Sequence, residues 1–221
     1  MTNKGSLIPV SWPETLVLKE GKWYDGIMKL IGFLKDDFYT AGHASLVVVC
    51  HEEKEFLYMD FGRYHTPNKH GRVRDKVTDP DLTIKTKAII EDGKVMNLEA
   101  LFRELAGLKA THGEGRLLAS EMYTEQLDKV YAKAKHIQSR EAIKYGPGNI
   151  GGSNCSRFVT QSCRLAKFSW FKKIMVYVPY TVSPSPRTNV KIINDYGYYY
   201  ELKDGVLTKK RNFLNSNKSA K

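Results

Sequence analysis

The chain of 221 residues is 42% hydrophobic and 27% charged and carries a formal net charge of +11, which suits one soluble globular domain with a substantial core. The N-terminal residues lack the apolar stretch of a secretory signal, and charged residues interrupt every apolar run before it reaches the length of a membrane span. Both observations predict a cytoplasmic protein.

The positive charge is spread along the chain, with one local excess near the C-terminus. Basic residues form no stripe with interleaved aromatic residues, so a solvated basic surface is favoured over a nucleic-acid or anionic-membrane partner. The oligomeric state is left open by the sequence.

The three cysteines, Cys50, Cys155 and Cys163, do not form a disulfide framework. Cys155 and Cys163 are eight positions apart on one predicted helix, a rise of about 12 Å, which is too far for a disulfide. The sequence holds no Cys-x-x-Cys or Cys/His cluster, so no metal and no other cofactor is expected.

The first elements mix helix and strand. Residues 1–20, with two prolines, predict an extended lead-in, and the apolar spacing of 23–35 predicts a helix. The β-branched run at 43–50 predicts a strand, which a charged turn connects to a returning strand at 56–61.

Helices and strands continue to alternate along the rest of the chain. The expected segments are strands at 83–90 and 94–96, a helix capped by Asn97, a strand at 117–122, a long helix from Thr124, a cysteine helix at 155–168, a strand at 174–178, an extended proline-containing stretch at 179–186, and a hairpin at 196–209. The order predicts a single α+β domain over residues 1–211 and a disordered basic tail over 212–221.

The run Gly-Gly-Ser-Asn-Cys at 151–155 has the composition that presents a thiol nucleophile. Ser153 or Asn154 can cap the helix that follows, which places Cys155 in the first turn. Unpaired N–H groups and the helix dipole favour a thiolate there. The alternative is that Cys155 is a small buried hydrophobe, the commoner fate of a free cysteine.

A thiol nucleophile needs a base, and one histidine is placed to supply it. His43 follows Gly42 at the mouth of a strongly apolar strand, where a polar side chain requires a reason. The others lie in polar loops, in a charged turn or beside the apolar stripe of a helix: His51, His65, His70, His112 and His136.

A Gly-His at the head of an apolar strand, a strand hairpin after it and a later Asn-Cys-x-x-Phe-Val resemble the circularly permuted branch of the NlpC-type papain-like superfamily. Lecithin:retinol acyltransferase and its phospholipid-acyltransferase relatives belong to this branch, in which the histidine precedes the cysteine. The runs at 11–15, 60–65 and 154–159 are also similar to an uncharacterised bacterial family of this type, over most of residues 8–190. The resemblance implies a central antiparallel sheet packed against the cysteine-bearing helix and further helices.

The resemblance also implies catalytic roles. Cys155 is the nucleophile, His43 is the general base, and a polar residue on the strand after the histidine strand orients the base. Asp60 is the choice for this third position if the loop connecting the two strands has an even number of residues, because Asp60 then faces the same side as His43. With an odd loop, His65 or Tyr58 becomes the candidate. The alternative for Asp60 itself is a turn-forming residue before Phe61-Gly62.

Three further residues are candidates for substrate binding. The backbone N–H of Cys155 can stabilise an oxyanion, and Tyr145 can add a hydroxyl, much as relatives carry a tyrosine before their cysteine. Arg63 can hold a carboxylate or phosphate, and Asn154 lies beside the nucleophile. The alternatives are a loop-anchoring aromatic for Tyr145 and an exposed loop arginine for Arg63.

These residues predict a thiol hydrolase (an amidase or peptidase) or an acyltransferase that forms a covalent acyl-enzyme with a small amide, peptide or ester. No export signal or hydrophobic anchor is visible, which favours a soluble substrate. The alternative is a catalytically inactive binding module of the same fold, which uses its basic surface to hold an anionic partner.

Overall fold

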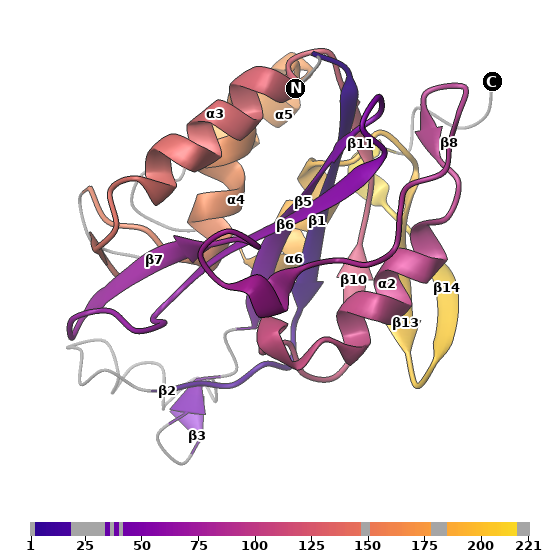
Figure 1. The fold of residues 1–221 in the computed structure, drawn as a ribbon. Helices are drawn as coiled ribbons and strands as arrows, with labels where there is room; N and C mark the ends of the chain where they lie inside the picture. Colours follow the sequence, from indigo (N-terminus) through magenta and orange to yellow (C-terminus); the bar gives the residue numbers. More distant parts are fainter. Residues whose placement is uncertain are drawn as a thin grey trace.

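A nine-stranded antiparallel sheet runs through the structure, a computed structural model that describes residues 3–18, 34–35, 38–39, 42–146, 151–177 and 185–215 (Figure 1). The strand order is β12-β7-β6-β5-β1-β10-β13-β14, with β11 also paired to β1. The strands are β1 (Gly5–Trp12), β5 (His43–Cys50), β6 (Glu55–Gly62), β7 (His70–Arg74), β10 (Leu117–Ala119), β11 (Met122–Thr124), β12 (Ile143–Lys144), β13 (Tyr198–Lys203) and β14 (Val206–Arg211).

The remaining described elements are short strands, helices and 3-10 turns. The short strands are β2 (Val17–Leu18), β3 (Leu34–Lys35), β4 (Phe38–Tyr39), β8 (Ile90–Glu91) and β9 (Lys94–Val95). The helices are α2 (Leu98–Gly107), α3 (Leu127–Gln138), α4 (Cys155–Cys163), α5 (Trp170–Tyr177) and α6 (Pro186–Ile192), and the 3-10 turns are η1 (Pro80–Leu82), η2 (Lys109–Thr111) and η3 (Phe213–Asn215).

The large sheet is covered on both faces, and alternate residues of β5 face opposite sides. Ala44, Leu46 and Val48 belong to a core shared with α3 and α4, whereas Val47 and Val49 belong to a core shared with α2. Every residue of β5 is buried, which is why the run is mostly apolar and is predicted as a strand from the sequence. The expected strands at 43–50 and 56–61 are confirmed, the second as β6 with one more residue at each end.

The lead-in expected at the N-terminus is instead the strand β1 in the interior of the sheet. All eight residues of β1 are buried, and they pair with β5 along its whole length, from Gly5 opposite Cys50 to Trp12 opposite His43. On its other edge β1 pairs first with β11 and then with β10, and Pro9 lies where the partner changes. A missing N–H is tolerated at such a break in the ladder, so the proline does not exclude a strand there.

Several other expected elements are wrong or shifted. The strand expected at 174–178 is wrong for 174–177, because Trp170–Tyr177 forms helix α5. Pro186 occupies the first turn of α6 instead of keeping the chain extended, and residues 178–184 lie outside the described residues. The segment 83–90 forms no continuous strand. Ile84 and Ala88 pack on the α2 side, and the pairings along the run are the isolated bridge of Lys87 with Glu55 and the pairing of Ile90 with Val95.

The boundaries of the later elements also differ from the expected ones. The strand expected at 117–122 is two strands, β10 and β11, the helix expected from Thr124 begins at Leu127, and the cysteine helix ends at Cys163 instead of residue 168. The hairpin around Asp204-Gly205 is present as β13 and β14. The helix expected at 23–35 lies mostly outside the described residues, and its last two residues form β3. Of the expected tail, Asn212 is buried and η3 follows it, whereas 216–221 lie outside the described residues.

Candidate active site

Cys155 is the first residue of α4, and the cap of that helix is the neighbouring Asn154. The Asn154 backbone is extended (φ −146°, ψ 178°), and its side-chain oxygen accepts a hydrogen bond from the Arg157 N–H at 2.9 Å. The sequence allowed either Ser153 or Asn154 as the cap, and in the structure the cap is Asn154, whose side chain stabilises the first turn of α4. Cys155 is 8% exposed, so the thiol lies just beneath the surface at the positive end of the helix.

His43 is brought to Cys155 by the start of strand β5. The imidazole lies beside Cys155, so that each group shifts the pKa of the other, and its Nε2 lies 3.1 Å from Asp60 Oδ2. The indole of Trp12, the residue paired with His43 on β1, stacks on the imidazole with ring centroids 5.9 Å apart. His43 is thus held between a thiol, a carboxylate and an aromatic face.

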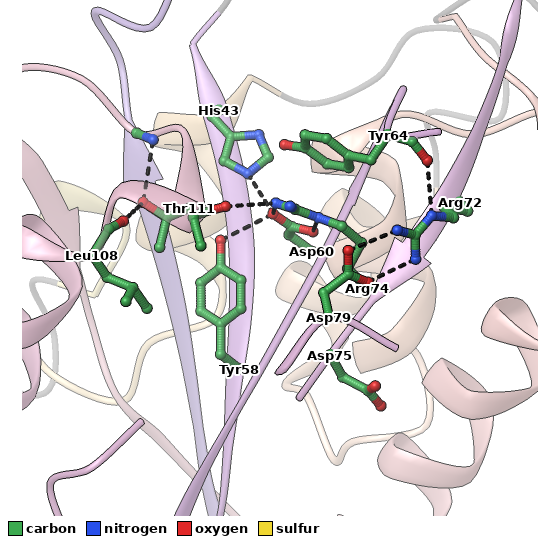
Figure 2. A network of polar contacts seen from close by, with 12 residues as sticks. His43, Tyr58, Asp60, Tyr64, Arg72, Arg74, Asp75, Asp79, Leu108 and Thr111 are labelled. Atoms are coloured by element: carbon green, nitrogen blue, oxygen red, sulfur yellow. Dashed lines mark hydrogen bonds and ion pairs between the residues drawn. The ribbon is translucent and has the colours of Figure 1, made fainter. Parts of the chain in front are cut away.

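Asp60 faces the same side of the sheet as His43, as the third residue of the site must. The turn between β5 and β6 holds four residues (51–54), and Asp60 pairs with Ser45, so it faces the same side of the sheet as His43. Its carboxylate is fully buried and also accepts hydrogen bonds from the Tyr58 hydroxyl at 3.1 Å and from the Arg74 guanidinium (Figure 2). Tyr58, the alternative for the third position, is therefore a second partner of Asp60.

The electrostatics of the three groups favour a thiolate–imidazolium pair. Burial alone would lower the pKa of His43, but hydrogen bonds to Asp60 and Cys155 outweigh it and raise the pKa to about 9. Burial alone would raise the pKa of Cys155, but the hydrogen bond with His43 outweighs it and the pKa is lowered. The pKa of Asp60 is likewise lowered despite its burial, because His43 and Arg74 both donate to the carboxylate.

The expected substrate-binding residues Tyr145 and Arg63 lie against each other. The Arg63 guanidinium is 5.2 Å from the centre of the Tyr145 ring, and that ring stacks almost parallel on Phe61, with centroids 5.9 Å apart. Tyr145 thus packs against the end of β6, which agrees with the loop-anchoring alternative. His65, the other alternative for the third position, is exposed in a left-handed turn (φ 50°), whereas the residue that hydrogen-bonds to His43 is the buried Asp60.

Two contributors to the site, Arg74 and Tyr64, were missed by the sequence analysis. Arg74 is directly opposite Asp60 in the β6–β7 ladder, and the centre of the Tyr64 ring lies 3.3 Å from its guanidinium carbon. The signal available in the sequence was weak: Arg72 and Arg74 alternate in a five-residue strand, and the register that brings Arg74 to Asp60 is not visible before the structure.

The other cysteines are unsuited to the same chemistry. Cys50 and Cys163 are fully buried, and burial raises the pKa of Cys163. Within the described part of the chain, no three His, Cys, Asp or Glu side chains are grouped so that they could hold a metal ion. Each helix among the described residues is too short or too polar to cross a membrane.

The antiparallel sheet, with a cysteine-bearing helix packed on it and the expected histidine on a central strand, defines a papain-like α+β fold, as the sequence predicted. The chain belongs to the TseH-like family of type VI secretion system effectors, whose family model matches residues 7–168. The structure is similar to the crystal structure of the type VI secretion system effector TseH, with a TM-score of 0.58 and 17% sequence identity over 96% of this chain and 100% of that chain. At this identity the likeness shows the fold. No curated protein gives a significant match to the chain.

Proposed function

We propose that this protein is a cysteine hydrolase in which Cys155 is the nucleophile, His43 the general acid and base, and Asp60 the residue that orients His43. The observation that carries the proposal is the buried cluster in which the His43 imidazole lies beside Cys155 and hydrogen-bonds to Asp60. A nucleophile, a base and a third group that orients the base are the parts that thiol catalysis needs. A structural cysteine would not require a buried histidine–carboxylate pair beside it.

The proposed reaction begins from the thiolate–imidazolium pair. The Cys155 sulfur attacks the carbonyl carbon of an amide or ester, and the carbonyl oxygen becomes an oxyanion that the Cys155 backbone N–H stabilises. As the intermediate collapses, the His43 imidazolium gives its proton to the leaving nitrogen or oxygen, which departs and leaves a thioester. Neutral His43 then takes a proton from water, whose oxygen attacks the thioester and releases the acid and the thiolate.

The order of the two motifs supports a finer assignment. His43 precedes Cys155 in the chain, which is the order of the circularly permuted NlpC-type branch, and we place the protein in that branch on this ground. Water is proposed as the acyl acceptor in preference to a second substrate. The proposed substrate is a small amide, peptide or ester. Since the chain belongs to a family of secretion-system effectors, we place this substrate where the effector is delivered, and the cytoplasm is then the place of synthesis.

The test is covalent labelling with a peptidyl acyloxymethyl ketone, which alkylates an activated thiol, followed by peptide mapping. The expected result is labelling of Cys155, none in Cys155→Ala, and at least about a hundredfold slower labelling in His43→Gln, because the imidazole no longer activates the thiol. Cys163→Ala is the matched control and should label as the wild type does. Wild-type labelling in His43→Gln would refute the proposal. So would an unreactive wild type whose binding to anionic vesicles or nucleic acid survives Cys155→Ala, which is the behaviour of a binding module.

A further inference from the structure

The carboxylate of Asp60 is held by more than the catalytic histidine. Arg74 donates from Nε to Asp60 Oδ1 at 3.0 Å and from Nη2 to Oδ2 at 2.7 Å, a two-pronged contact that fixes both the position and the plane of the carboxylate. Because Asp60 and Arg74 are paired residues of β6 and β7, the sheet register itself brings them together. The Arg74 side chain is 4% exposed and that of Asp60 is fully buried.

The four buried groups balance in charge. The thiolate of Cys155 and the carboxylate of Asp60 each carry one negative charge, and the imidazolium of His43 and the guanidinium of Arg74 each carry one positive charge. Without Arg74 the cluster would hold one uncompensated negative charge away from water, which is costly. Either Asp60 would take up a proton and cease to support the imidazolium, or the excess negative charge would oppose the thiolate. Both responses disfavour the ionised form of Cys155.

Arg74 is itself held in place from three sides (Figure 2). Its Nη2 donates to the Ala110 carbonyl at 3.0 Å, and the Tyr64 ring covers its guanidinium. The Tyr64 carbonyl in turn accepts from Arg72 Nε at 2.8 Å, and Arg72 forms a two-pronged ion pair with Asp79, with both distances 2.7 Å. An arginine with this many partners is one whose orientation the fold specifies.

We propose that Arg74 is a positioning residue of the site: it keeps Asp60 ionised and aimed at His43, and through them it stabilises the thiolate of Cys155. This inference rests on the proposed function. The other titratable and charged groups around Cys155, His43, Asp60 and Arg74 come from β6 and from three loops. They are Tyr58 from β6, Tyr64 from the loop after β6, Asp79 from the loop after β7, and His112 from the loop after η2, whose ring stacks on Tyr64 at 5.2 Å.

The test is the pH dependence of Cys155 alkylation by iodoacetamide, measured by mass spectrometry of the Cys155 peptide in wild type, Arg74→Gln and Arg74→Lys. In Arg74→Gln we expect the acid limb to move up by about one pH unit, so that alkylation at pH 6 is about tenfold slower. Arg74→Lys keeps the charge but loses the two-pronged contact, and its acid limb should return at least halfway to the wild-type position. A purely structural role would predict no such rescue by charge.

Two controls separate this effect from others. Arg103→Gln removes an exposed arginine that pairs only with Glu99 on the surface of α2, and its profile should match the wild type. His112→Asn removes the neighbouring titratable ring at a left-handed position that asparagine tolerates, and it should leave the acid limb in place. A wild-type profile in folded Arg74→Gln would overturn the inference.

If Arg74→Gln does not fold, the pH dependence of Cys155 alkylation is compared between Asp60→Asn and the double variant Asp60→Asn/Arg74→Gln. In the double variant a neutral amide pair replaces the ion pair. Because Arg74 acts through Asp60, the two profiles should coincide. A further shift of about one unit in the double variant would overturn the inference. Its failure differs from failure of the proposed function: an acid limb near pH 8.5 in the wild type would refute the activated thiol itself, whatever Arg74 does.

Discussion

Replacing Asn154 should destabilise the helix that presents Cys155 while leaving every proposed catalytic group in place. The side-chain oxygen of Asn154 accepts the Arg157 N–H at 2.9 Å, and an alanine at this cap leaves that N–H without the contact. Loss of such a cap costs about 1 kcal/mol, which for a chain of this length lowers the melting temperature by about 2–4 °C. Asn154→Asp keeps the acceptor and should retain most of the stability.

The aspartate variant separates stability from reactivity. Its carboxylate lies next to the Cys155 thiolate, and a like charge raises the pKa of the thiol, so iodoacetamide should react more slowly at pH 6 than with the wild type. Asn154→Ser, an uncharged cap, is the matched control and should keep both properties. Urea unfolding followed by circular dichroism measures the first effect, and mass spectrometry of the Cys155 peptide measures the second. The reasoning fails if Asn154→Ala is as stable as the wild type, or if Asn154→Asp is as unstable as Asn154→Ala.

Two other predictions concern pH and close packing. Turnover of a chromogenic ester should be bell-shaped, with an alkaline limb near pH 9 where His43 loses its proton and an acid limb below the ordinary thiol range because the pKa of Cys155 is lowered. The rate of alkylation by iodoacetamide, which needs only the thiolate, should show the acid limb without the alkaline fall. An acid limb with its midpoint near pH 8.5 in both ester turnover and alkylation would contradict this prediction. Gly62→Ala should cost about 1–3 kcal/mol in urea unfolding, since its Cβ would lie 2.2 Å from the Tyr64 ring. Gly107→Ala, with nothing within 4 Å, is the control, and equal stabilities would count against the close approach.

The parts of the site that local sequence determines were predicted. A cap followed by a cysteine is a pattern of adjacent residues, so the start of α4 at Cys155 can be read directly. The face on which Asp60 lies was predicted only as a condition on the parity of the turn after the apolar run from His43, and the four-residue turn in the structure meets that condition. These features need no knowledge of distant contacts.

The parts that depend on pairing between distant segments were not predicted. Pro9 and Pro13 made the N-terminal run look irregular, although its burial between two neighbouring strands makes it β1. The spacing of Trp170 and Ile174 fits helix α5, and a short apolar run does not distinguish helix from strand. Arg74 was overlooked for the same reason, since its meeting with Asp60 depends on the register between β6 and β7.

The groups of the candidate site come from β1, β5, β6, β7 and α4, and Cys155 lies far along the chain from His43. During synthesis the strands that carry His43, Asp60 and Arg74 emerge first, and Cys155 gains its partners only when α4 docks on the finished sheet. Until that step the thiol has neither His43 nor the sheet beside it and should behave as an ordinary one. Reactivity of Cys155 at mildly acidic pH therefore counts completely folded molecules, and it offers a direct measure of refolding yield.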